Sequence, residues 1–452
     1  MEKHNIKESS LGEKLPEATG EIRLKRTLNL IQTVFIGVGT AIGGVIFAIM
    51  GRAAQIAGPS IVITFLIGAF FALLMGLSYA ELGAFVPGAA GGAIAFVEKA
   101  FGKRIPAFIA GWFSWIGSIT DCAIGSVVFA LSINFFLRWV EPFTLAIITI
   151  LVFALINFRG TRSMSIVQFV LTGVLIFALC FFMAGSSLSF ETSRFEPFFP
   201  KGIFPMFSMV SFIFPTYAGY ESITQMSEEV KTAGKNIPRA LFLTLAVITL
   251  LFTGASIAMV GGAPPNVYAN SVTPLQDVAT YFMGPVGGAV VSAACIVATL
   301  TTINGAMAGG TRIAFALSRN DFLPSVFKKV HPKYRSPFVA LALTALLAVF
   351  FVLTRSVDFI VYAISLGYSV TAIMVALALI RLRKTEPHLY RPFKVPLYPY
   401  TPIIAIAALA FMIATLSLES LVLGIAFGGV GLLLLFAGNK VRKKPKPKEA
   451  NG

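Results

Sequence analysis

The chain has 452 residues, of which 56% are hydrophobic and 12% are charged, and its mean hydropathy is +0.83. Soluble domains carry about 25% charged residues, so this composition excludes an ordinary soluble protein, a disordered chain and a nucleic-acid-binding domain. The formal net charge is +16, from 36 Lys and Arg against 20 Asp and Glu. In so apolar a chain, the positions of the basic residues along the sequence are more informative than their number.

Twelve apolar runs are long enough to cross a bilayer as helices, which takes about 20 residues each. They lie near 28–51, 60–86, 107–134, 140–158, 163–186, 203–226, 240–262, 282–310, 337–354, 358–380, 402–418 and 420–438. Residues 1–27 are polar and lack the apolar core of a signal peptide, so we expect the first run to be retained. The sequence therefore predicts an all-α membrane protein with a twelve-span domain at 28–438 and a basic tail at 439–452.

The basic residues are distributed unevenly between the segments that connect these runs. With twelve spans, 31 of the 36 Lys and Arg fall in the N-terminal segment, the tail and alternate connections, and five fall on the other side. Basic residues mark the cytoplasmic side of membrane proteins. We therefore expect a multi-pass protein of the cell membrane with both termini in the cytoplasm and with membrane lipid around its spans.

Two of the runs contain helix breakers at corresponding places. The first reads Gly-Val-Gly-Thr-Ala-Ile-Gly-Gly from Gly37 to Gly44, and the sixth carries Pro215 and Gly219. Each opens a five-span half, 28–186 and 203–380, and the two halves run in opposite directions, with 402–438 as two further spans. Broken helices at matching positions of inverted repeats indicate the central site of a transporter. The alternative for the first run is that Gly39 and Gly43 form a small-residue packing face.

An unwound helix in the middle of a membrane exposes two kinds of backbone group. Amide N–H groups at the start of one half-helix favour an anion, and carbonyl groups at the end of the other favour a cation. An α-amino acid carries both a carboxylate and an ammonium group. The two breaks together therefore predict recognition of an amino acid backbone.

At this point the sequence resembles the amino acid–polyamine–organocation transporter family over nearly its whole length. The similar segments are Gly39 to Phe47, Tyr79 to Leu82 followed by Pro87-Gly88 and Gly91-Gly92, Tyr217 to Ser222, Arg312 with Ala316 to Arg319 and Asp321 to Pro324, and Arg391 to Pro399. The resemblance implies a LeuT-type fold, with five plus five inverted spans and two additional ones. It also implies alternating access around a site between spans 1, 3, 6 and 8.

Carried over by position, the resemblance assigns backbone groups to the substrate. The backbone of Gly43, Gly44 and Val45 would bind the carboxylate. The carbonyl of Ala41, with the span-6 break at Tyr217 and Ala218, would bind the amino group. Many relatives have Gly-Ser-Gly where this chain has Gly43-Gly44-Val45, so carboxylate recognition would rest on amide groups alone.

Ionisable side chains inside spans are costly and are therefore functional candidates. By the same resemblance, Ser118 and Asp121 fall near the substrate side chain, where Asp121 could pair with a cationic group. The alternatives are a protonated aspartate in a helix–helix hydrogen bond, or a proton-relay acid. Glu221 could gate the site with pH, as in the similar arginine/agmatine antiporters, or could hydrogen-bond freed backbone. Glu81 is interpreted as structural or gating.

The coupling ion and the gate stay open at this level. Thr301 and Thr302 in span 8 lie where sodium-coupled relatives bind sodium, although threonine also bonds to helix backbone. Span 5 has no lysine, which argues against one proton mechanism of the family. The alternatives to sodium are coupling through Glu221 or Asp121, or simple exchange. Tyr217 is a candidate aromatic gate.

The sequence therefore predicts a secondary active transporter of amino acids, with cationic amino acids or related amines as one substrate class, and with proton-linked uptake or exchange. The alternatives are a sodium-coupled symporter of neutral amino acids and, on the same scaffold, a channel or a non-transporting sensor. The histidines lie in polar segments, the three cysteines form no ligand spacing, and no catalytic motif is present. We expect no enzyme activity, no cofactor, no metal site and no nucleic acid partner.

Overall fold

The computed structural model describes residues 28–86, 92–102, 104–137, 139–158, 164–225, 227, 230–332, 334, 336–416 and 418–442. The α-helices are α1 Leu30–Ala41, α2 Val45–Ala57, α3 Ile61–Phe85, α4 Ala93–Phe101, α5 Arg104–Phe136, α6 Pro142–Phe158, α7 Met164–Ser186, α8 Phe204–Ile213, α9 Ser222–Gln225, α10 Ala233–Gly262, α11 Pro265–Tyr268, α12 Pro274–Arg319, α13 Phe338–Leu353, α14 Val357–Thr385, α15 Tyr400–Ala414 and α16 Leu418–Arg442. The 3₁₀ helices are η1 Gly58–Ser60, η2 Thr192–Phe195, η3 Phe214–Tyr217 and η4 Ser325–Lys328. Within these residues the one extended pairing is a bridge between Leu28 and Val230.

The helices occupy each of the twelve apolar runs, so the all-helical prediction is confirmed. Six segments are long and apolar enough to cross a membrane by length and composition. These segments are Val45–Phe85, Ile105–Asn134, Phe169–Ser186, Ala233–Gly262, Pro274–Arg319 and Val357–Thr385. Shorter apolar helices lie at Leu30–Ala41, Pro142–Phe158, Phe338–Leu353, Tyr400–Ala414 and Gly424–Leu433. That the chain crosses the membrane twelve times stays a prediction.

Several helices differ in length from the predicted spans. α12 begins at Pro274 and ends at Arg319, although the apolar run covers only 282–310, and α10 begins seven residues before its run. Hydropathy marks the part of a helix that suits lipid, whereas the backbone hydrogen bonds continue into polar sequence. α12 also bends at Gly284, whose φ of +70° interrupts the helix immediately before Pro285.

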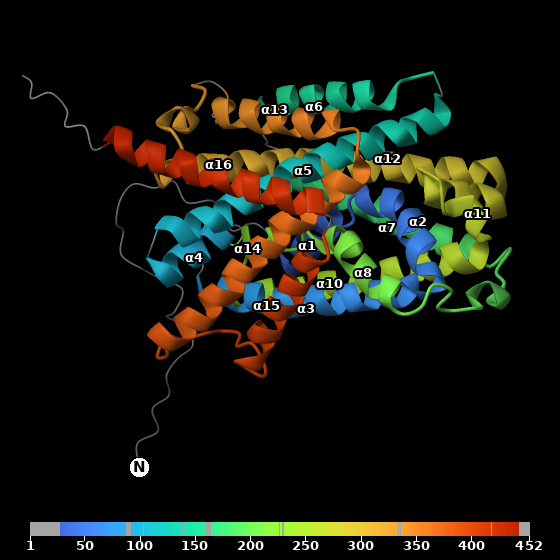
Figure 1. The fold of residues 1–452 in the computed structure, drawn as a ribbon, viewed down its shortest axis with the longest axis horizontal. Coiled ribbons are helices and arrows are strands. Elements are labelled where there is room, and N and C mark those ends of the chain that lie inside the picture. The colour runs from blue at the N-terminus through green and yellow to red at the C-terminus, as the bar shows by residue number, and fades with distance from the viewer. Residues whose placement is uncertain are drawn as a thin grey trace, which may run out of the picture.

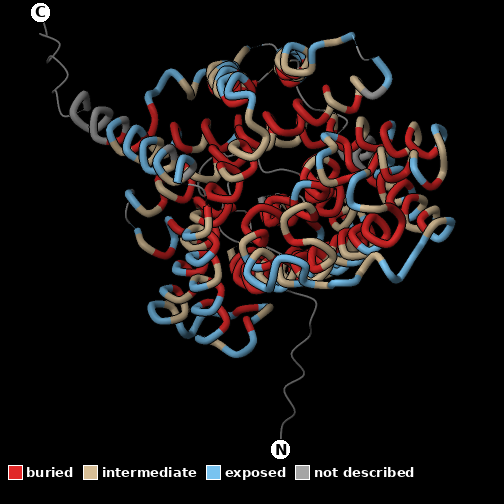
Figure 2. Tube along the Cα trace, turned by 45° about the vertical axis from the view of Figure 1, so that its right-hand side comes forward, coloured by how far each residue is buried: buried red, intermediate tan, exposed pale blue. Residues whose placement is uncertain are grey.

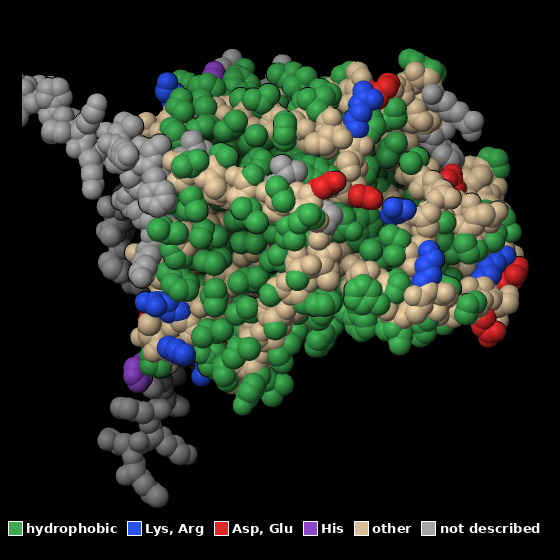
Figure 3. All heavy atoms as spheres, viewed as in Figure 1, with side chains coloured by type: hydrophobic (Ala, Val, Ile, Leu, Met, Phe, Trp, Pro, Cys, Tyr) green, Lys and Arg blue, Asp and Glu red, His purple; other side chains and the backbone are tan. Residues whose placement is uncertain are grey.

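α5 lies at the centre of the packing. It contacts α12 and α14 most extensively, while α3 pairs with α10 and α6 pairs with α13 (Figure 1). Figure 2 shows the buried residues concentrated in the interior of the bundle. The outer helices carry large exposed apolar side chains such as Leu155, Phe177 and Leu250. Figure 3 shows a band of mainly hydrophobic side chains between two regions of charge, as lipid contact requires.

A buried ion cluster joins the C-terminal ends of α3 and α14 to the segment before α15. Glu81 is fully buried, and its carboxylate accepts hydrogen bonds from Arg383 at 2.8 and 2.5 Å. The guanidinium of Arg391 lies 3.2 Å from the same carboxylate, and the backbone N–H of Val395 donates to it at 2.7 Å. Glu81 therefore ties three segments together, which matches the structural interpretation of this residue.

Candidate functional site

The first span is broken where the glycines predict it. α1 ends at Ala41, and α2 begins at Val45. Between them Ile42 has non-helical angles, φ −77° and ψ 67°, and the N–H of Gly43 donates to the carbonyl of Ala41 at 2.8 Å. The first N–H groups of a helix have no partner within that helix, so the amides that open α2 are available to a ligand.

The sixth span is broken as well. α8 ends at Ile213, η3 follows, and Ala218 is extended. Gly219 has a φ of +104°, which a residue with a side chain rarely adopts. Its N–H donates to the Glu221 carboxyl at 2.9 Å, and Glu221 is buried. Glu221 therefore satisfies backbone freed by the break, as one of its two interpretations requires.

The two breaks lie directly against each other. A methyl group placed on Gly219 would lie 2.8 Å from the carbonyl oxygen of Thr40 and 3.1 Å from the amide nitrogen of Ala41. The carbonyl end of α1 therefore meets the unwound part of span 6, and the amide end of α2 follows after three residues, at Val45. These two helix ends carry partial charges of opposite sign, and such a pair complements an ammonium and a carboxylate group.

The span-1 break also packs closely on α12. A methyl group on Gly43 would lie 2.8 Å from the Thr302 hydroxyl, and one on Gly44 would overlap the methyl group of Thr299. The hydroxyls of Thr301 and Thr302 donate to the carbonyl of Ala298 at 2.7 and 3.1 Å. The structure thus places Thr302 beside the break, and it adds Thr299, one helical turn away, which the sequence analysis missed.

This packing predicts that a substitution at the break reduces uptake and that a second substitution on α12 partly restores it. We expect Gly43→Leu and Gly44→Ala to lose uptake, because their side chains would overlap α12 and displace the amides that open α2. Uptake by Gly44→Ala should return in part when Thr299→Ala removes the methyl group that it meets. The measurement is the initial uptake rate in proteoliposomes, normalised to folded protein. Full uptake by Gly43→Leu would contradict a site at this break.

The predicted side-chain reader Asp121 has a partner that the sequence analysis missed. Tyr368 on α14 donates its hydroxyl to the Asp121 carboxyl at 2.6 Å. Asp121 keeps some exposure, whereas its neighbours Thr120 and Cys122 are fully buried. Ser118 instead donates to the carbonyl of Ser114 on its own helix. No sequence motif marks Tyr368, which lies inside the apolar run 358–380.

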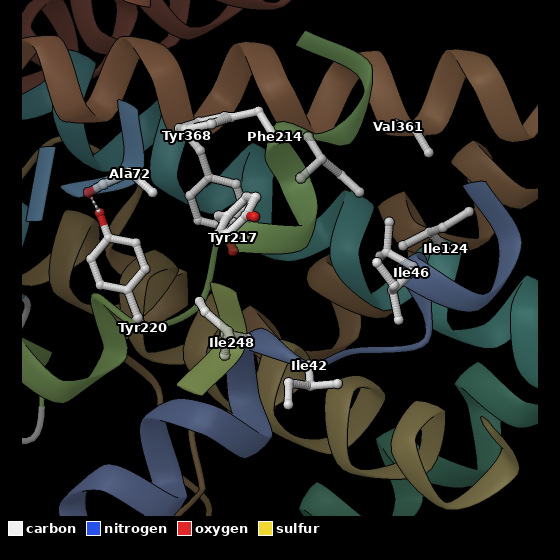
Figure 4. Packing of buried hydrophobic residues seen from close by; sticks show 14 of the residues in the cluster. Ile42, Ile46, Ala72, Ile124, Phe214, Tyr217, Tyr220, Ile248, Val361 and Tyr368 are labelled. Carbon is white, nitrogen blue, oxygen red and sulfur yellow. Dashed lines mark hydrogen bonds between the residues drawn. The ribbon is translucent and has the colours of Figure 1, made fainter. Parts of the chain in front are cut away.

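Tyr217, the predicted gate, is hydrogen-bonded and packed against other aromatic rings in this conformation. Its hydroxyl donates to the carbonyl of Phe65 at 2.8 Å, and its ring is fully buried against Phe65 and Phe252. Figure 4 shows the neighbouring Tyr220, whose hydroxyl donates to the carbonyl of Ala72 in α3. The gating role of Tyr217 stays a prediction, since the side chain holds span 6 to α3 here.

Known proteins are similar to this chain over most of its length. Residues 28–428 match the profile of the amino acid permease family. The branched-chain amino acid permease BcaP of Bacillus subtilis (strain 168) is 25% identical over 459 residues, covering 97% of this chain and 98% of the relative. The serine/threonine exchanger SteT of the same organism is 28% identical, covering 93% and 98%. Its methylthioribose transporter is 27% identical, covering 84% and 86%.

The match over most of the chain and the all-helical fold agree with each other. The protein is a multi-pass membrane protein and an amino acid transporter rather than an enzyme. The predicted resemblance is thereby confirmed. The chain belongs to the amino acid permease family of the APC superfamily.

Proposed function

We propose that this protein is a secondary active transporter that holds the backbone of an α-amino acid between its two helix breaks and moves it by alternating access. The observation that carries the proposal is the contact of the Gly219 backbone with Thr40 and Ala41, which brings the span-6 break against the carbonyl end of α1. The amides of Gly44 and Val45 are proposed for the carboxylate; Gly43, the third predicted position, already donates its N–H to the carbonyl of Ala41. The carbonyl of Ala41 and the backbone of Tyr217 and Ala218 are proposed for the ammonium group.

We further propose that Asp121 reads the substrate side chain and favours a cationic amino acid or a related amine. A carboxylate inside a membrane protein is costly unless it is paired, and a cationic substrate supplies the missing charge. Within the described residues, the one partner of Asp121 is the neutral hydroxyl of Tyr368. Transport is proposed to be coupled to a proton or to proceed by exchange. Glu221, a second acid near the breaks, is the candidate for gating or proton coupling.

A second candidate is a carrier of neutral amino acids, coupled to sodium. The names of BcaP and SteT concern branched-chain amino acids, serine and threonine, which have uncharged side chains. The bond between Tyr368 and Asp121 also fits a helix–helix contact with a protonated acid. The Thr302 hydroxyl beside Gly43 offers a hard oxygen ligand of the kind that sodium prefers.

A thermal-shift panel on purified protein separates the two candidates. Wild type and Asp121→Asn are compared with L-lysine, L-ornithine, L-arginine, cadaverine, L-leucine, L-serine and L-glutamate. We expect the cationic ligands to stabilise wild type and to lose this effect in Asp121→Asn. Glu419→Gln, which removes an exposed acid from the first turn of α16, is the matched control.

The opposite pattern would reject the cationic assignment. If L-leucine or L-serine stabilises both proteins equally and the cationic ligands stabilise neither, the protein is a neutral amino acid carrier. Proteoliposomes with an imposed proton or sodium gradient, or preloaded with unlabelled substrate, then identify the coupling. Uptake driven by sodium alone would favour the second candidate.

The proposed topology has twelve spans and both termini on the cytoplasmic side. The uneven distribution of Lys and Arg supports it. Cysteine labelling of single-cysteine variants from each side of a sealed vesicle tests it, since labelling of the N-terminal segment from the outside would contradict it.

A further inference from the structure

The side chains of Asp121 and Tyr368 meet because the backbones of α5 and α14 come close together. A methyl group on Gly367 would lie 2.8 Å from the carbonyl oxygen of Phe113 and 2.9 Å from the amide nitrogen of Gly117. A methyl group on Gly117 would lie 3.5 Å from the ring of Tyr368. Two glycines thus let the Tyr368 ring lie over α5 one turn before Asp121. The close approach of the two helix backbones therefore fixes the position of the Tyr368 hydroxyl.

The Tyr368 hydroxyl occupies one of the two oxygens of the carboxyl group. It donates to Oδ2 of Asp121 at 2.6 Å, and among the described residues nothing donates to Oδ1. A carboxylate can accept about four hydrogen bonds, so most of its capacity is unused. Asp121 is also partly exposed at a point where Thr120 and Cys122 are fully buried. The second oxygen is therefore open to a further donor.

A single strong donor changes what such an acid can bind. Away from water, a carboxylate without hydrogen bonds takes up a proton and then offers no charge to a cation. A hydroxyl that donates to the carboxylate stabilises its charged form, and such charge-assisted bonds are about twice as strong as neutral ones. The same bond fixes the orientation of the carboxylate. Both effects favour a cationic ligand at the open oxygen.

We infer that Tyr368 is a positioning residue that sets the preference of the site for cationic over neutral substrates. It holds Asp121 as an oriented carboxylate, and the second oxygen of that carboxylate receives the ammonium or guanidinium group of the substrate side chain. The inference rests on the proposed role of Asp121, and it adds a residue of α14 to the site. A helix–helix contact alone would tie α5 to α14 but would not distinguish one ligand class from another.

The test is the selectivity of Tyr368→Phe, which keeps the ring and removes the hydroxyl. Dissociation constants for L-lysine and L-leucine are measured by calorimetry on the purified full chain. The ratio of the L-lysine constant to the L-leucine constant is expected to rise about tenfold or more. In the Asp121→Asn background, Tyr368→Phe should leave this ratio where Asp121→Asn alone puts it. Tyr362→Phe, on the same helix with its ring on Phe212, is the matched control.

Each outcome decides a different point. If wild type prefers L-lysine and Asp121→Asn abolishes the preference, but Tyr368→Phe keeps it, the inference is wrong and the cationic assignment stands. If wild type binds L-leucine and not L-lysine, both fail together. If Tyr368→Phe lowers the affinity for both ligands by the same factor, Tyr368 is a packing residue and the inference is again overturned.

Discussion

Replacing Glu81 with glutamine is expected to lower the free energy of unfolding by about 3 to 5 kcal/mol, which is typical when one partner of a buried ion pair is removed. Glutamine keeps the size of the side chain but leaves the guanidinium groups of Arg383 and Arg391 without a counter-charge. Both are well shielded, with exposed side-chain fractions of 17% and 4%. The measurement is the thermal unfolding midpoint of purified protein in nanodiscs, which should fall well below that of wild type.

The control for this variant is a second acid that pairs with a base near the surface. Glu386 lies 3.9 Å from Lys99, and both side chains are about one-third exposed, at 35% and 36%. Exposed ion pairs contribute about 0 to 1 kcal/mol, so Glu386→Gln should shift the midpoint little. Equal shifts for the two variants would show that the Glu81 cluster does not hold α3 and α14 together.

Gly219→Ala is expected to reduce uptake by about tenfold or more. The residue has a φ of +104°, and such a backbone costs of order 1 to 3 kcal/mol for a residue with a side chain. The new methyl group would also overlap the carbonyl of Thr40, so spans 1 and 6 would have to separate at the site. The initial uptake rate per folded molecule in proteoliposomes measures the loss.

Substitutions of two other glycines distinguish the effect of backbone strain at Gly219 from the effect of its contact with Thr40. Gly202 has a φ of +80° but open space around it, and Gly173 lies in α7 with open space and no positive φ. Gly202→Ala should cost stability with little change in uptake, and Gly173→Ala should change neither. If Gly202→Ala and Gly219→Ala impair uptake equally, backbone strain explains the effect and the contact between the breaks does not.

The features that the sequence predicted well are those encoded locally. An apolar run of about 20 residues predicts a helix wherever it stands, and the helices follow the runs. Glycine and proline act on their own stretch of backbone, so Gly43, Gly44, Pro215 and Gly219 marked both breaks. The positions proposed for the substrate and the ion came from a resemblance and stay predictions.

The features that the sequence did not predict are contacts between distant segments. Asp121 and Tyr368 are 247 residues apart, and no local motif connects them. Thr299 was missed because its relevant contact, between its methyl group and Gly44, joins two helices that are far apart in sequence. Such pairings depend on how helices pack, which hydropathy and local breakers do not specify.

The Glu81 cluster has a consequence for the order in which the protein is made. Glu81 and Arg383 are separated by 302 residues, and Val395 lies further on. Because synthesis proceeds from the N-terminus, α3 exists before either guanidinium has been translated. During synthesis the acid therefore lacks the partners of this cluster, which closes only when α14 and the segment after it are complete. A chain truncated before residue 383 carries an acid with no counter-charge from this cluster, so this bond distinguishes a finished molecule from an interrupted one.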